Sequence, residues 1–362
     1  MLLFLDESII EALEQYLDAN VENIEFLIEL HRDRIHYVTG KRAILRKILD
    51  LVQKRLGVGH IKVFEQIISE CSDGVSYYKV LSRKVRVVSS GDGVMVSNTD
   101  NAREWLVPLP IVTCLSQRAK IIGEHLNDAK ILEFAAKVYA IKSRLNHKLI
   151  CLEKAMAGGS GNAPTVVRSA ISEAISPVFC CLDSDRLYPD GPESHSCRDC
   201  RGIVSDRGVY DFYATTEREM ENVIPLEVIN GAIMHLDTSS DRDEMLNSFE
   251  LAKDVRQKFR EIYAYGDLKE GTCGEWVNRQ DINVKKFYEN VDYSSHCGCN
   301  ETCSGSYLKK IGQRILEHCV LYLERASRPE MQRISECASS DSWLDIGSRV
   351  YAISFANKLR AT

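Results

Sequence analysis

Acidic side chains stand directly after two short apolar runs of the chain. Residues 119–123 are followed by Glu124, and residues 177–182 are followed by Asp183-Ser184-Asp185. If both runs are parallel strands, their carboxyl ends meet at one edge of a sheet. Carboxylates gathered there repel one another and raise one another's pKa values unless a cation is bound. Hard oxygen donors of this kind favour Mg²⁺ or Mn²⁺.

The segments around these acids alternate between strand-like and helix-like patterns. Such alternation indicates an α/β fold with a parallel sheet and right-handed crossovers. The predicted order is strand 119–123, helix 127–144, strand 148–152, a glycine-rich loop 158–161, helix 164–175 and strand 177–182.

A glutamate after one strand and an Asp-x-Asp after a later strand resemble the TOPRIM domain of topoisomerases, primases and several nuclease families. The separation of Glu124 and Asp183 is 183 − 124 = 59 residues, which suits the family. Asp128 matches the aspartate of the family's Glu-Gly-x-x-Asp, although His125 replaces the glycine. The resemblance covers about residues 108 to 225 and implies a Rossmann-like parallel core.

The segment Arg218-Glu219-Met220-Glu221-Asn222 is similar to the Arg-x-x-Glu-Asn of overcoming-lysogenization-defect (OLD) nucleases and related anti-phage effectors. This resemblance implies a divalent-metal-dependent nuclease with two Mg²⁺ or Mn²⁺ ions. Asp183 and Asp185 would bind metal, and Glu124 would bind metal or transfer a proton. Asp128 and Glu221 would hold the second ion, with Asn222 in support. Read without the resemblance, Glu221 is an acid favoured by a helix dipole.

A lysine often neutralises the developing charge in such sites. The sequence offers four candidates and does not choose among them: Lys285, Lys286, Lys309 and Lys310. Many OLD relatives also carry an ATPase, but this chain has no phosphate-binding loop. The resemblance therefore implies a separate activating or sensing protein, and a role as the toxic effector of a defence system.

Two groups of cysteines have spacings that suit tetrahedral Zn²⁺. The first is Cys197-x-x-Cys200, preceded by His195, and the second is Cys297-x-Cys299-x-x-x-Cys303. A structural zinc would join the two groups through four thiolates, or through three with a histidine. The alternative is a set of reduced thiols without metal.

A basic stretch lies between residues 31 and 55, with eight Lys or Arg against two acids. Arg42, Arg46 and Lys47 are the expected nucleic-acid contacts, because phosphates attract such clusters. A solvated helix face is the alternative.

The chain has 362 residues, a net charge of −6 and no apolar run of membrane-spanning length. We expect a cytoplasmic protein in three regions: 1–105, mostly helical with a β-hairpin formed by residues 85–96; 106–225, the α/β core; and 226–362, a helical region. The thirteen cysteines are expected to be reduced.

Two further interpretations stay open. The TOPRIM-like domain could be a non-catalytic scaffold or sensor that binds a protein partner. Less directly, the acids could transfer phosphate or nucleotidyl groups on small substrates. The sequence does not determine the oligomeric state or distinguish DNA from RNA.

Overall fold

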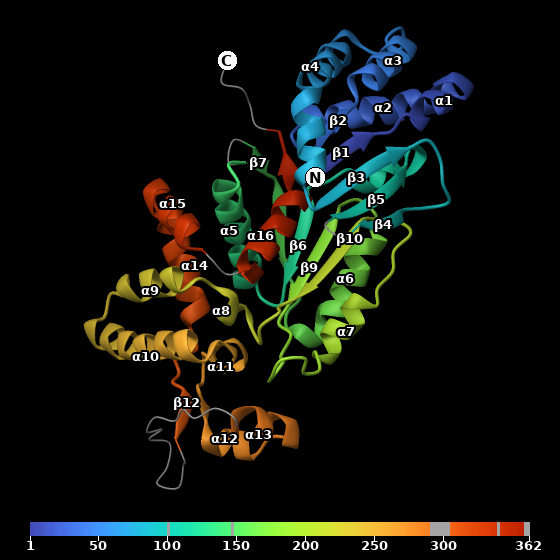
Figure 1. Cartoon of the computed structure of the whole chain (residues 1–362). Coiled ribbons are helices and arrows are strands. Elements are labelled where there is room, and N and C mark those ends of the chain that lie inside the picture. The colour runs from blue at the N-terminus through green and yellow to red at the C-terminus, as the bar shows by residue number, and fades with distance from the viewer. Residues whose placement is uncertain (100–101, 146–147, 290–304, 339–340, 358–362) are drawn as a thin grey trace.

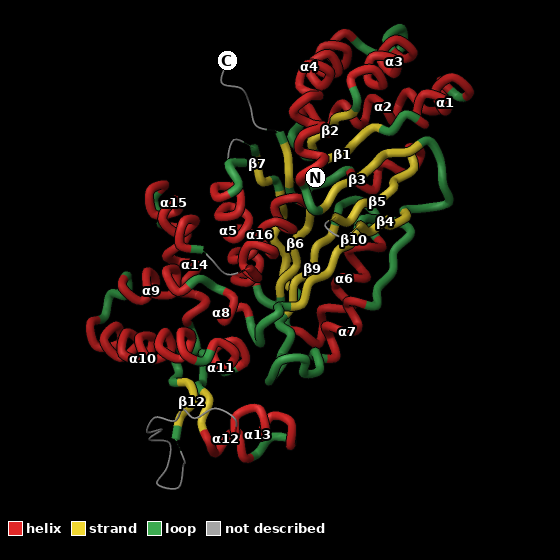
Figure 2. Tube along the Cα trace, viewed as in Figure 1, coloured by secondary structure: helices red, strands yellow, loops and turns green. Residues whose placement is uncertain are grey.

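The chain is a mixed α/β protein with two sheets built largely from parallel strands, as Figures 1 and 2 show. The computed structural model describes residues 1–99, 102–145, 148–289, 305–338 and 341–357. Within these residues, no helix combines the length and the apolar character that crossing a bilayer requires.

The first sheet has five strands in the order β2-β1-β3-β5-β4, all parallel except β4. Its strands are β1 Leu2–Leu5, β2 Tyr37–Gly40, β3 Arg83–Val88, β4 Met95–Thr99 and β5 Ala102–Pro108. The helices between them are α1 Ser8–Gln15, α2 Leu17–Arg32, α3 Arg42–Val52 and α4 Val58–Val80.

This sheet corrects two expectations for residues 1–105. The region is mostly helical, as expected, but it is an α/β unit, because Leu2–Leu5 and Tyr37–Gly40 are strands that were not predicted. Both strands are buried throughout, so they lack the polar–apolar alternation that identifies a half-exposed strand. The expected hairpin of residues 85–96 is also wrong, since β5 lies between β3 and β4 in the sheet. The hairpin that forms joins β4 to β5.

The second sheet has four parallel strands in the order β10-β9-β6-β8. They are β6 Ala119–Gly123, β8 Leu152–Met156, β9 Val178–Leu182 and β10 Tyr210–Ala214. The helices of this unit are α5 Leu126–Lys142, α6 Ala163–Ser172 and α7 His195–Arg201, with 3₁₀ turns η1 Leu109–Leu115 and η2 Ser160–Asn162. Helix α5 covers one face, and α6 and α7 cover the other (Figure 1).

The predicted strands 119–123 and 177–182 are present, whereas the predicted strand 148–152 is displaced. The strand beside β6 is β8, Leu152–Met156, which is an edge strand and largely exposed. The apolar residues before it instead form β7, Leu149–Ile150, which pairs with β13, Phe355–Ala356, near the end of the chain. Strand β10 was not predicted.

Residues after 217 are mostly helical, as expected, with three short strands added. The helices are α8 Met220–Val223, α9 Leu226–Met234, α10 Ser239–Lys258, α11 Arg260–Tyr265, α12 Gly274–Asn278, α13 Ile282–Glu289, α14 Ile315–Arg325, α15 Arg328–Cys337 and α16 Asp341–Ile353. The strands are β11 Thr272–Cys273, β12 Ser306–Leu308 and β13.

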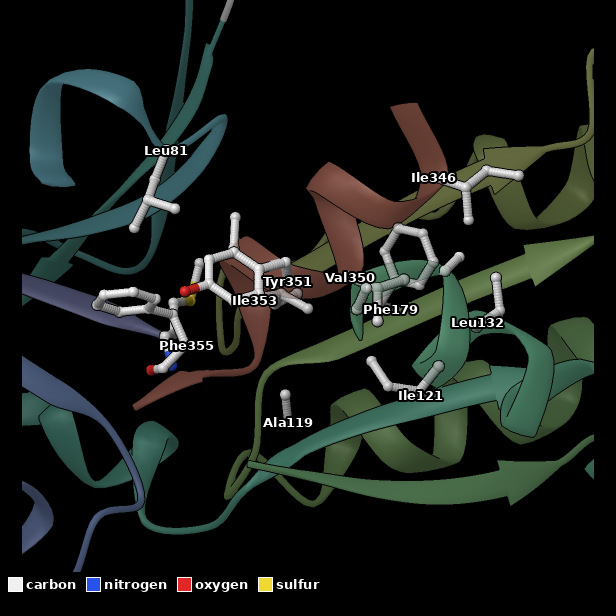
Figure 3. Packing of buried hydrophobic residues seen from close by; sticks show 14 of the residues in the cluster. Leu81, Ala119, Ile121, Leu132, Phe179, Ile346, Val350, Tyr351, Ile353 and Phe355 are labelled. Carbon is white, nitrogen blue, oxygen red and sulfur yellow. The ribbon is translucent and has the colours of Figure 1, made fainter. Parts of the chain in front are cut away.

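The C-terminal helix α16 packs back on α5 and extends the core of the second sheet. Its Ile346 and Val350 lie in one buried cluster with Phe179 of β9 and Ile121 of β6 (Figure 3). Helix α16 is therefore built onto the α/β core rather than standing apart from it.

Candidate metal centre

The ends of β6 and β9 bring Glu124 and Asp183 together. The two strands pair in parallel, with Ile122 opposite Cys180, so the residues that follow them leave the same edge of the sheet. The backbone N–H of Asp183 donates to Oε1 of Glu124 at 3.3 Å. The predicted meeting of these two strand ends is therefore present in the structure.

Asp128 lies in the first turn of α5 and closes its N-terminus. Its Oδ2 accepts a hydrogen bond from the backbone N–H of His125 at 2.7 Å, and the His125 side chain reciprocates in a capping box. A Cβ at Gly123 would lie 2.6 Å from the Cβ of Asp128. Only glycine therefore allows Asp128 to pack this closely against the end of β6. Asp128 thus caps α5. It also belongs to a cluster of carboxylates that we call the acidic group: Glu124, Asp128, Asp183, Asp185, Glu219 and Glu221.

The loop after β9 is fastened by the serine between its two aspartates. Ser184 is fully buried, its N–H donates to Oγ1 of Thr215 at 2.9 Å, and its hydroxyl donates to the carbonyl oxygen of Glu217 at 2.6 Å. Asp185 has a φ of 57°, and its N–H donates to the carbonyl oxygen of Arg218 at 3.0 Å. These bonds join the Asp-x-Asp loop to the segment that leads into α8.

Helix α8 and the residue before it add Glu221 and Glu219 to the acidic group. Oδ1 of Asp183 accepts from the N–H of Met220 at 2.8 Å, at the start of this helix. Asn222 accepts from the N–H of Glu219 at 3.1 Å, and its amide donates to the carbonyl oxygens of Tyr263 at 2.7 Å and Gly266 at 3.0 Å. Asn222 therefore fixes α8 against α11 and orients the neighbouring Glu219 and Glu221.

The carboxylates raise one another's pKa values because they share a partly desolvated space. Burial, followed by the charges of Asp128 and Asp185, raises the pKa of Glu124 to about 7. Burial and then Glu221 hold the pKa of Asp183 well above its usual range. Burial also raises the pKa values of Asp128 and Glu221, and desolvation followed by Glu219 raises that of Asp185. The surroundings of the acidic group therefore do not stabilise the full negative charge that its carboxylates would carry if all of them were ionised.

One lysine that sequence reasoning did not single out lies within this group. Nζ of Lys269 is 3.0 Å from Oε2 of Glu219 and 3.3 Å from Oε1 of Glu221. Burial opposes the charge of Lys269, but Glu221 and Glu219 outweigh it and raise the lysine's pKa. Lys269 lies in the loop between α11 and β11, where no local pattern marks it. The lysine that pairs with Glu219 and Glu221 is therefore not one of the four candidates that the sequence offered.

The donors fit a hard divalent cation. Oε2 of Glu221 is buried and has no hydrogen-bond partner, which is costly for a carboxylate. Glu124, Asp128 and Asp183 each use one carboxylate oxygen in a backbone hydrogen bond described above. Within the part of the chain that the structure describes, no three or more acidic, histidine or cysteine side chains are placed so that they could hold a metal ion as they stand. Side-chain adjustment would therefore accompany metal binding.

The first cysteine group does not include His195. Cys197 and Cys200 are buried on the inner side of α7, whereas the side chain of His195 is 80% exposed and its Nδ1 lies 3.0 Å from Asp199. The difference arises because positions 197 and 200 of the short helix face the sheet and position 195 does not. In this structure His195 does not lie with these two thiols, and its part in a zinc site stays a prediction.

Both thiols have partners near the acidic group. Sγ of Cys197 donates to the carbonyl oxygen of Asp183 at 3.1 Å, and Cys200 is hydrogen-bonded to Cys180 of β9. Cys297, Cys299 and Cys303 lie outside the described residues, so the zinc that would join the two groups stays a prediction.

The basic stretch lies far from the acids. Arg42, Arg46 and Lys47 are exposed on α3, and in Figure 1 α3 lies at the top of the molecule whereas α8 lies near its middle. Arg42 and Arg46 line a surface cavity of about 470 Å³ that also includes Asp50 and Glu65. These side chains cannot contact a phosphate held at the carboxylates.

Comparison of the chain with protein-family models, with curated proteins and with solved structures gives no match. The function must therefore be inferred from the residues themselves.

Proposed function

We propose that this protein is a divalent-metal-dependent nuclease that hydrolyses phosphodiester bonds of DNA or RNA at the acidic group. One observation carries the proposal: Glu124 and Asp183 from the ends of β6 and β9 meet beside the start of α8 at one sheet edge, where burial and neighbouring carboxylates raise their pKa values. This arrangement stores electrostatic repulsion that a divalent cation relieves.

The chain's own residues have distinct roles in this proposal. Glu124, Asp183 and Asp185 would hold a Mg²⁺ or Mn²⁺ ion, with Asp128 beside them. The bound ion would polarise the scissile phosphate and lower the pKa of a water molecule. Glu124 would either hold the ion or accept a proton, and its raised pKa of about 7 in the metal-free site suits the second role. Ser184 and Asn222 keep the loop and α8 in place and do not take part in the chemistry.

The first test is cleavage by the purified protein with Mg²⁺ or Mn²⁺. Glu124→Gln and Asp183→Asn should each lower the rate at least 100-fold, because each removes a charge that faces the cation. Glu173→Gln is the matched control, since Glu173 pairs with Lys120 on the surface. Cleavage at the unchanged rate by both site variants would contradict the proposal.

The resemblance to anti-phage effectors adds a second part to the proposal. A separate sensing or activating protein would control the nuclease, which would then act as a toxic effector. Expression with the neighbouring genes of its source should reduce growth after phage infection, and Asp183→Asn should remove this effect. Growth reduction that persists in Asp183→Asn would contradict a toxic nuclease.

One observation favours the alternative of a non-catalytic scaffold. Lys269 already neutralises Glu219 and Glu221, so part of the acidic group is stable without metal. A scaffold predicts that Glu124→Gln and Asp183→Asn keep full biological activity. The same variants therefore separate the two functions.

A further inference from the structure

The acidic group divides into two halves that differ in how their charge is compensated. In the first half, both oxygens of Glu219 are used: Oε1 lies 3.3 Å from Arg218 and Oε2 lies 3.0 Å from Lys269. Oε1 of Glu221 lies 3.3 Å from the same lysine. Arg218 and Lys269 thus compensate the negative charge of this half.

The second half has no such cation. Among the described residues, no lysine or arginine lies within 4 Å of the carboxylate oxygens of Glu124, Asp128, Asp183 or Asp185. Yet Asp183 is close enough to Glu221 for that charge to be the main neighbour raising its pKa. The halves are therefore adjacent. Lys269 and Arg218 contact only the first half, and the second half feels their charge only from a distance.

Lys269 is held on its acids by a built turn. Oδ1 of Asp267 accepts from the N–H groups of Lys269 at 2.9 Å and Glu270 at 2.7 Å. The turn closes at Gly271, which has a φ of 85° and whose N–H donates to the carbonyl oxygen of Asp267 at 3.0 Å. A Cβ on Gly271 would lie 3.0 Å from the carbonyl oxygen of Leu308, so glycine is required there for space as well.

The same aspartate organises the second cation. Oδ2 of Asp267 accepts from Nη2 of Arg218 at 3.0 Å, while Nε of Arg218 lies on Glu219. One carboxylate that is not part of the acidic group therefore positions both the lysine and the arginine. A lysine held in this way is a fixed feature of the site rather than a mobile surface side chain.

We propose that the ammonium of Lys269 takes the place of a second metal ion, so that the site binds one divalent cation, at Glu124, Asp183 and Asp185. This inference rests on the proposed function, and it replaces the two ions that the family resemblance implies with one. An ammonium is a compact point charge with three donors, which suits two neighbouring carboxylates. Because it is covalently attached, it stays in place at any metal concentration.

A site with one ion binds metal in a single step. A single ion gives a hyperbolic dependence of binding on Mn²⁺ concentration, and removing the lysine charge should open a second position beside Glu219 and Glu221. Lys269→Met keeps most of the length of the side chain and removes its charge. Lys269→Arg keeps the charge.

The test counts bound Mn²⁺ by electron paramagnetic resonance and calorimetry on the full chain after treatment with a chelator. The wild type and Lys269→Arg should bind one ion, and Lys269→Met should bind two. Lys253→Met is the control and should bind one, since Lys253 pairs with Glu250 on the exposed side of α10. Without metal, Lys269→Met should melt below the wild type, and Mn²⁺ should restore its melting temperature.

Two ions on the wild type would overturn the inference, and this result does not depend on whether any variant folds. One ion on a folded Lys269→Met would overturn it as well. Either result together with metal-dependent cleavage leaves the proposed function standing. No bound ion and no cleavage in the wild type would overturn the proposed function itself.

Discussion

At the scale of single residues, Glu124 shows how position sets chemistry. It follows β6, faces Asp128 and Asp185 and accepts a hydrogen bond from the N–H of Asp183. Burial and the two neighbouring charges favour its protonated form, whereas the hydrogen bond favours the carboxylate. The balance raises its pKa to about 7, so its charge changes near neutral pH.

This pKa predicts how the stability of the metal-free protein depends on pH. Between pH 4.5 and 7 the native state binds more protons at Glu124 than the unfolded state does, so stability falls as pH rises through this window. The shift corresponds to an upper bound of about 3 kcal/mol, which partial exposure reduces to about 1–2 kcal/mol. Urea unfolding at pH 5 and pH 8 should show the loss, and Glu124→Gln should lessen it.

Saturating Mg²⁺ should reverse this trend, because a bound cation stabilises the ionised carboxylates. Metal-free protein that is more stable at pH 8 than at pH 5, with the difference unchanged in Glu124→Gln, would contradict the assigned environment.

At the scale of elements, the short helix α8 depends on contacts outside itself. Four residues make too few intrahelical hydrogen bonds to hold a helix alone. Its start is fixed by Asp183, and the side chain of Asn222 joins it to the carbonyl oxygens that end α11. The orientation of Glu219 and Glu221 is therefore set by β9 on one side and α11 on the other.

Removing the Asn222 amide should loosen α8. We expect Asn222→Ala to lower the free energy of unfolding by about 2–3 kcal/mol, since it leaves buried carbonyl oxygens without donors. Asn222→Asp keeps the acceptor for the N–H of Glu219 but loses the donors, so it should also destabilise and should weaken Mn²⁺ binding less than Asp183→Asn does. Unfolding in urea and metal titration check both variants. An Asn222→Ala variant with wild-type stability would contradict this role.

At the scale of the whole molecule, a buried ion-pair group connects the two sheets. Oδ2 of Asp211 on β10 lies 2.7 Å from Nε of Arg83 on β3, and its Oδ1 lies 2.8 Å from Nη1 of Arg103 on β5. Asp211 is 1% exposed. The N-terminal sheet is thus tied to the sheet that carries the acids.

Breaking this connection should be costly. Asp211→Ala should destabilise the protein by about 3–5 kcal/mol, because it leaves the Arg83 charge buried without its partner. Glu250→Ala, which removes an exposed pair with Lys253, should change stability by less than about 1 kcal/mol. Urea unfolding measures both, and equal effects would show that the Asp211 group does not join the sheets energetically.

Because α3 lies far from the acids, we expect α3 to bind the backbone of a long substrate without affecting cleavage at the acids. Reversing Arg42, Arg46 and Lys47 to glutamate should weaken binding of long nucleic acid and reduce the salt slope by about 2–3, because up to three phosphate contacts are lost. Cleavage of a short oligonucleotide at the acids should keep its rate. Unchanged affinity and salt slope for long nucleic acid would leave α3 as a solvated helix face.

Local sequence patterns were enough to predict the strands β6 and β9 and the acids that follow them. Apolar runs bounded by turn residues are local signals, and parallel pairing then brings their carboxyl ends to one edge. The mixed α/β class and the mostly helical segments after residue 217 follow from patterns of the same local kind.

The remaining features depend on packing between segments that are distant in the sequence. Strands β1 and β2 are short and buried on all sides, so they carry no alternation that separates them from helical or loop segments. Lys269 contacts Glu219 and Glu221, and Asp267 contacts Arg218, in each case across about 50 residues of chain. An ion pair of that kind depends on how α8, α11 and the loop after α11 pack, and packing over such distances leaves no pattern in any local stretch of sequence.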